Sequence, residues 1–124
     1  MTSNREAQIS KLNVGDMFHA SFPNGATRIC IVTLVNNTML AARAITTQEN
    51  FDFDRIFGRA KSLEGAVCTM DSVYSLSTET RDTLLQIDRR YGGEPGPEGL
   101  PLSNMERRAI IDAGAIFSSN PLPP

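Results

Sequence analysis

The sequence predicts an α+β fold in which a small five-stranded antiparallel β-barrel is followed by two C-terminal α-helices packed on it. Before Ser77, short apolar or alternating runs are separated by turn signals, whereas after Ser77 the apolar residues recur at helical spacing. The chain has 124 residues, of which 40% are hydrophobic and 21% charged, so it is long enough for one well-filled core. We therefore expect a single domain over residues 1–124.

The first part of the chain predicts two strands joined by a tight turn. Residues 1–13 are polar and are expected to be a tail or short turn that leads into a β-barrel over residues 14–76. The first strand begins after Gly15, and its alternate residues point to opposite faces. A Pro-Asn-Gly sequence at 23–25 reverses the chain. Residues 27–35 are apolar on both faces along most of their length, which is typical of a central strand covered on two sides.

Three further strands complete the predicted barrel. An Asn-Asn pair gives a second reversal before a third strand at 38–47. Phenylalanine and aspartate alternate within residues 49–58, which predicts a fourth strand with one face in solvent, and residues 65–76 give a fifth. Short strands joined by tight turns usually curl into a barrel. This architecture resembles the SH3-like small barrels, in which a Gly-Asp pair, here residues 15–16, commonly precedes the first strand.

The sequence predicts a first C-terminal helix at 77–91. Ser77 or Thr78 is a suitable N-cap, and Gly92 ends the helix. Its apolar positions at helical spacing are Leu84, Ile87 and Tyr91. The segment 92–102 holds four glycines and three prolines in eleven residues, so we expect a loop there.

A second C-terminal helix is predicted at 103–119. Ser103 and Glu106 have the spacing of a capping box, which pairs two backbone donors at a helix start. The predicted apolar stripe consists of Met105, Ala109, Ile110, Ala113, Ile116 and Phe117. We expect the barrel to bury this stripe, because each large side chain so buried contributes roughly 1.5–3 kcal/mol. Residues 120–124 are expected to form a disordered tail.

The first hairpin decides whether a reactive cysteine is possible. A two- or four-residue turn would place His19 opposite Cys30, and a two-residue turn at the Asn-Asn pair would then place Arg43 beside Cys30. An imidazole and a cation next to a thiol activate it. A three-residue turn at 23–25 instead places Phe18 opposite Cys30. Turn chemistry favours three residues, because Pro suits the second position of a type I turn and Gly the left-handed position. We therefore expect scaffold residues and no enzyme activity.

Charge and cysteine content indicate which partners and which cellular compartment to expect. Twelve basic and 14 acidic side chains give a formal net charge of −2, so the chain lacks the positive excess that drives non-specific nucleic-acid binding. Cys30 and Cys68 could form one disulfide, but the polar start shows no signal segment, so a reducing cytoplasm is expected. No apolar run approaches the roughly 20 residues of a membrane helix, so no membrane contact is expected.

One set of residues is a candidate binding strip. Arginines on the barrel and at the end of the first C-terminal helix, with a tyrosine as a stacking surface, could bind single-stranded nucleic acid. The candidate binding residues are Arg28, Arg43, Arg89, Arg90 and Tyr91. The alternative interpretation is that Arg89 and Arg90 simply suit the negative end of a helix dipole.

The sequence predicts no metal ion and no cofactor. Glu49, Asp52 and Asp54 are hard oxygen donors, but alternating carboxylates usually mark the solvent face of an edge strand. A single histidine and two distant cysteines do not give zinc-site spacing. The glycines of 92–102 are not followed by the Gly-Lys-Ser/Thr of a phosphate loop.

The resulting hypothesis is a cytosolic, bacterial, non-catalytic adaptor or binding module that acts through a protein partner. A small protein without catalytic motifs is also typical of a phage or prophage accessory or inhibitor protein. The first alternative is a small barrel that binds single-stranded nucleic acid, and the second is a small cysteine-dependent enzyme. The sequence does not predict the oligomeric state.

Overall fold

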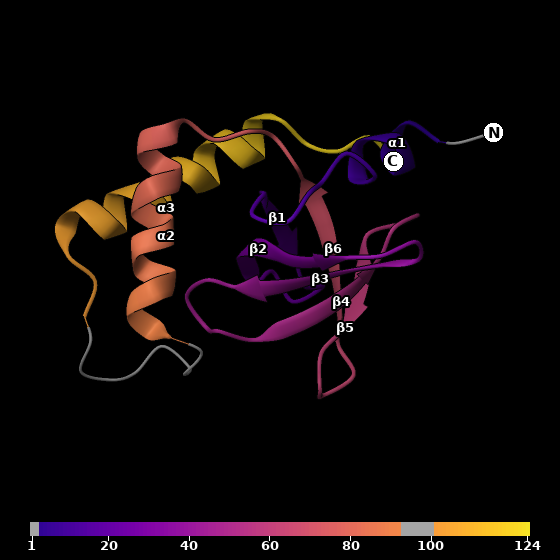
Figure 1. Ribbon diagram of the computed structural model, residues 1–124, viewed down its shortest axis with the longest axis horizontal. Helices are drawn as coiled ribbons and strands as arrows, with labels where there is room; N and C mark the ends of the chain where they lie inside the picture. Colours follow the sequence, from indigo (N-terminus) through magenta and orange to yellow (C-terminus); the bar gives the residue numbers. More distant parts are fainter. Residues whose placement is uncertain (1–2, 93–100) are drawn as a thin grey trace.

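The computed structural model describes residues 3–92 and 101–124 and shows a nearly closed antiparallel β-barrel of six strands followed by two C-terminal helices (Figure 1). In chain order the elements are α1 (Asn4–Ile9), β1 (Met17–Ser21), β2 (Thr27–Val35), β3 (Met39–Ala44), β4 (Asn50–Asp54), β5 (Arg59–Lys61), β6 (Val67–Ser72), α2 (Thr78–Tyr91) and α3 (Asn104–Ser119). The strand order in the sheet is β4-β3-β2-β1-β6-β5, and all neighbours are antiparallel. The predicted α+β class is confirmed, with six strands instead of five.

The additional strand is β5, which lies between the predicted fourth strand at 49–58 and the predicted fifth strand at 65–76. The predicted strand at 49–58 stops at Asp54, because this carboxylate accepts hydrogen bonds from the backbone N–H groups of Ile56, Phe57 and Arg59 and so closes a turn. Burial alone would raise the pKa of Asp54, but these backbone donors together lower it. The chain then returns as β5 and pairs with β6.

The three-residue turn at 23–25 is confirmed. Phe18 lies opposite Cys30, and His19 lies opposite Ile29. The N–H of Phe22 donates to the carbonyl of Ala26 at 2.8 Å across the turn, and Gly25 has φ +91°. The same geometry recurs between β5 and β6, where the N–H of Ser62 donates to the carbonyl of Ala66 at 2.8 Å and Gly65 has φ +89°.

The barrel interior is apolar. Phe18 and Phe53 meet edge to face with ring centroids 5.1 Å apart. Their buried neighbours from the strands are Ala20, Cys30, Val32, Leu40, Ala42, Ala44, Phe51, Ala60, Cys68 and Met70. Each strand therefore contributes its alternate residues to one interior, as the predicted alternation requires.

One end of the barrel is closed by the two ends of the chain, which the sequence analysis did not predict. Ile9 and Leu12, in and after α1, and Leu122 of the tail are buried with the barrel interior. The Arg5 guanidinium donates to the carbonyls of Phe57 (2.7 Å), Met70 and Pro123. The expectation of a disordered tail at 120–124 is therefore wrong.

Backbone and side-chain hydrogen bonds hold the tail against β6. The N–H of Leu122 donates to the carbonyl of Asp71, and the hydroxyl of Ser72 donates to the carbonyl of Asn120, both at 2.7 Å. The docking of the tail is not evident from its polar and proline-rich sequence, because it depends on a single buried leucine and a few hydrogen bonds.

Helices α2 and α3 lie against one side of the barrel's outer surface (Figure 1). Met17, Ile31 and Ile45 from the barrel pack against a helical layer. The helical side of this second core consists of Leu84, Ile87, Tyr91, Ala109, Ala113 and Phe117. Packing of the helices on the barrel is confirmed.

The helix ends follow the predicted caps. Ser77 caps α2, and Gly92 ends it with φ +58°. The capping box of Ser103 and Glu106 is present at α3. Within the predicted stripe of α3, Ala109, Ala113 and Phe117 are buried, but Met105 and Ile116 are exposed. Most of the predicted loop at 92–102, residues 93–100, lies outside the described residues.

Candidate functional site

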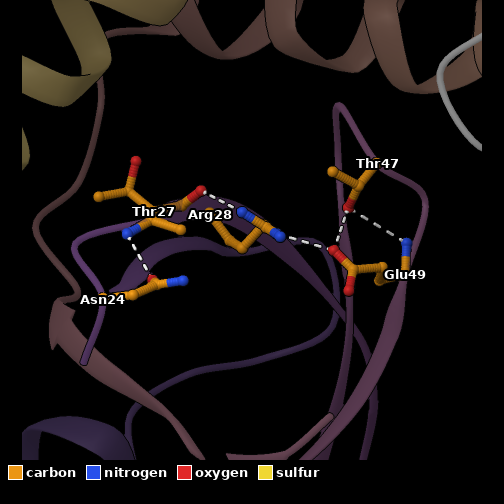
Figure 2. Close-up of polar contacts among 6 residues, drawn as sticks. Asn24, Thr27, Arg28, Thr47 and Glu49 are labelled. Atoms are coloured by element: carbon orange, nitrogen blue, oxygen red, sulfur yellow. Dashed lines mark hydrogen bonds and ion pairs between the residues drawn. The ribbon is translucent and has the colours of Figure 1, made fainter. Parts of the chain in front are cut away.

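Arg28, the first residue of the predicted strip, is paired with a carboxylate. Its Nε donates to Glu49 at 2.7 Å, its Nη1 donates to the carbonyl of Thr27 at 2.9 Å, and Thr47 also donates to Glu49 (Figure 2). The guanidinium lies 5.0 Å from the ring centroid of Phe22. Partial burial alone would raise the pKa of Glu49, but the bonds from Thr47 and Arg28 lower it.

Arg43 is paired with a carboxylate of α2. Its Nε and Nη2 donate to the two oxygens of Asp88 at 2.9 and 2.6 Å, a bidentate geometry. Gln48 donates to Asp88 at 2.9 Å and to the carbonyl of Ile45 at 2.6 Å, with a backbone φ of +59°. Burial would raise the pKa of Asp88, but these donors, with the charges of Arg43 and Arg89, lower it.

The remaining predicted residues lie on α2. Arg90 donates to Glu106 at 2.7 Å, and Glu106 is only 1% exposed. Tyr91 is buried in the second core, whereas Arg89 is exposed. The structure thus places three of the four arginines in ion pairs within the fold, and the predicted stacking residue Tyr91 is buried.

The cysteine and the histidine lie on opposite sides of the barrel wall. Cys30 is fully buried in the interior, and this burial, with the charge of Cys68 second, raises the pKa of its thiol well above the usual value. His19 faces outward: its Nδ1 lies 2.6 Å from Asp71, and its ring lies 5.6 Å from that of Phe117. The pair that an activated thiol needs is therefore not assembled.

The predicted acidic candidates are also separate. Glu49 bonds to Arg28, Asp54 closes its turn, and Asp52 is exposed on β4. Within residues 3–92 and 101–124, no three His, Cys, Asp or Glu side chains come together as a metal site. Among these same residues, no helix has the length and apolar character needed to cross a membrane.

The surface is concave where β1 and β6 separate. Their ladder ends at the His19–Ser72 pair, and the connection to α2, residues 73–77, leaves the sheet. A hollow of about 740 Å³ opens between this connection, the start of β1 and the residues around α1. It is lined by Gln8, Lys11, Leu12, Asp16, Met17, Val73, Tyr74, Ser75, Leu76, Arg81, Asn120 and Pro121.

A second hollow lies on the other side of the same connection. It measures about 550 Å³ and is bounded by the start of α2 and the C-terminal half of α3, including Ile116. Both hollows share Tyr74, Ser75 and Leu76. We call residues 73–77 with the two hollows the connection groove.

The connection groove presents unused backbone groups beside apolar and charged side chains. Within the described parts of the chain, the N–H groups of Ser75 and Leu76 donate to no other group. Tyr74 is 50% exposed, and Leu12 and Met17 lie in the larger hollow. The sequence does not reveal this site, because its residues come from three distant segments and match no motif.

No family model, no curated protein and no solved structure matches the chain.

Proposed function

We propose that this protein is a non-catalytic adaptor module, with an SH3-like small barrel, that binds an extended segment of a partner protein in the connection groove. The N–H groups of Ser75 and Leu76, which donate to no group in the described chain, carry the proposal. An extended peptide that pairs with such an edge gains main-chain hydrogen bonds, while flanking hollows accept its alternate side chains. Tyr74 supports this role, since a half-exposed aromatic ring with a polar tip is typical of binding surfaces.

The remaining features support a module without chemistry of its own. The thiols of Cys30 and Cys68 are buried in the barrel interior, and Cys30 is away from His19. Free buried cysteines favour a reducing cytoplasm, which we propose as the location. A bacterial or phage inhibitor protein that captures a segment of its target fits the same geometry.

The direct test is selection of random linear peptides on the full chain, followed by an NMR titration with an enriched peptide. We expect the largest shifts at Tyr74, Ser75 and Leu76 and smaller ones in the turn between β5 and β6. Enriched peptides that shift only other surfaces, or no enrichment, would overturn the proposal.

A variant and a second probe sharpen this test. Ser75→Pro removes one edge N–H and should weaken binding of the enriched peptide, whereas Leu63→Ala, at the exposed β5–β6 turn, should not. A short mixed oligonucleotide should cause no shifts even at low salt, since Arg43 and Arg90 are already paired. Salt-sensitive shifts with the oligonucleotide would favour nucleic-acid binding instead.

A further inference from the structure

The larger hollow of the connection groove has a defined charge pattern. Its charged lining side chains are Lys11, Asp16 and Arg81, so two cations face one carboxylate. The carboxylate is already in use, because Asp16 accepts a hydrogen bond from the N–H of Asn13 at 2.8 Å. The described lining is therefore positive on balance, in a protein whose net charge is −2.

Arg81 is fixed in position for binding. Its Nη2 donates to the carbonyl of Gly15 at 2.9 Å and ties the start of α2 to the approach to β1. Gly15 itself is fixed, since its N–H donates to Val32 at 2.9 Å. A guanidinium has five N–H donors in a planar fork, so one bond to a carbonyl leaves others for a carboxylate.

Apolar side chains lie next to these cations. Leu12 and Met17 are almost fully buried, and each contributes to the lining of the hollow. Leu76 is half-buried at the opposite wall. An acidic side chain and an apolar side chain could thus be accommodated together within one short extended segment.

We infer that the segment bound in the connection groove carries an acidic side chain that pairs with Lys11 and Arg81, beside an apolar side chain that packs on Leu12 and Met17. This inference rests on the proposed function and adds the chemistry of the partner. Charge-assisted bonds from two cations give orientation and reject basic segments, while the apolar contact adds affinity.

Parallel peptide selections on the wild-type chain and on charge-reversed variants test the inference. We expect wild-type peptides to be enriched in Asp or Glu beside an apolar residue. Lys11→Glu should lower the affinity for such a peptide about tenfold or more and shift the selection toward Lys and Arg. Lys11 is exposed and makes no side-chain hydrogen bond within the described chain, so the variant should fold.

Two controls separate charge from structure. Lys61→Glu makes the same change on β5, outside both hollows, and should leave the affinity unchanged. Arg81→Lys keeps the charge and should retain more affinity than Arg81→Glu. Added salt should weaken the wild-type complex more than the Lys11→Glu complex.

The outcomes distinguish the two proposals. If no peptide is enriched or none contacts the groove, the proposed function fails. If peptides bind the groove without an acidic preference, and Lys11→Glu changes neither sequence preference nor affinity, only the acidic-segment inference is overturned.

Discussion

The barrel interior and the interface between barrel and helices are both buried, but they are built differently. The interior holds apolar side chains and two thiols, with Phe18 and Phe53 near its centre. The interface has an apolar centre and ion pairs around it. Arg43–Asp88 joins the barrel to α2, and Arg90–Glu106 joins α2 to α3. On the barrel surface, Nδ1 of His19 lies 2.6 Å from Asp71, beside Phe117.

The difference shows that apolar alternation and specific charge pairs determine different parts of the fold. Alternation of side chains suffices to fill the barrel, because any register with the correct faces buries the same apolar set. The helices need more, since an apolar stripe alone allows them to slide and rotate. Charge pairs at defined positions select one arrangement, although their net contribution to stability is small.

The largest expected effect tests the interior. Phe53→Ala removes a fully buried ring that contacts Phe18 and should cost about 3–5 kcal/mol in unfolding free energy. Chemical denaturation followed by circular dichroism measures it. Since the helices dock on the barrel, they should unfold in the same transition. A barrel that loses less than about 1 kcal/mol would contradict this description of its core.

The next effect tests the helical layer, where Arg90 of α2 meets Glu106 of α3. Glu106→Ala removes the acceptor of Arg90 and of the Ser103 N–H and should cost about 2–4 kcal/mol. Glu106→Gln can keep the capping bond and should cost less. Hydrogen exchange should show α3 amides losing more protection than barrel amides. An equal loss of amide protection in α3 and in the barrel would mean that the Arg90–Glu106 pair does not stabilise α3 specifically.

A smaller effect contrasts two glycines. Gly25→Val should cost about 1–3 kcal/mol, because φ is +91° there although a Cβ would meet no atom within 4 Å. Gly114→Ala, in α3 with equal space and no positive φ, should stabilise by about 0.4–1 kcal/mol. Thermal unfolding measures the stability of both variants. A Gly25→Val variant as stable as the wild type would mean that the turn tolerates another backbone conformation.

The interface should also respond to acid. The pKa of Asp88 is lowered in the folded state, so its stabilisation is present above the unfolded value of about 4 and is lost as the pH falls through the folded pKa. Asp88→Asn should cost about 1–2 kcal/mol at pH 7 and reduce this acid dependence. Denaturation at pH 7 and pH 3 measures both. Asp52→Asn, on the exposed face of β4, is the control.

The last prediction concerns the reactivity of the two cysteine thiols in the native protein. Burial raises the pKa of Cys30 well above its usual value and that of Cys68 to about 11. Both thiols should therefore resist alkylation at pH 8 in the native state and react only on unfolding. Rapid alkylation of native Cys30 would contradict this prediction and favour the hypothesis of a cysteine-dependent enzyme.

The sequence predicted the parts of the fold that depend on local patterns. The turn at 23–25, the capping box of α3 and the α+β order follow from nearby residues. It missed α1, β5 and the docked tail, which are short and depend on distant partners. Arg5 illustrates this, because its three carbonyl acceptors come from segments that no local pattern connects to it.

The candidate site was harder to predict for the same reason. Arg28, Arg43 and Arg90 looked available as cations, but their carboxylate partners lie 21, 45 and 16 positions away in the chain. Lys11, Tyr74 and Arg81 carried no motif, and only the separation of β1 and β6 brings them together.

The docking of α1 and the tail at one barrel end determines where an attached domain or tag would emerge. Arg5 holds Pro123, and Lys11, Asn120 and Pro121 line the larger hollow. A domain attached next to either of these segments would thus lie beside the connection groove. The opposite β5–β6 turn, whose Leu63 side chain is fully solvent-facing, is the better position for a label or surface anchor.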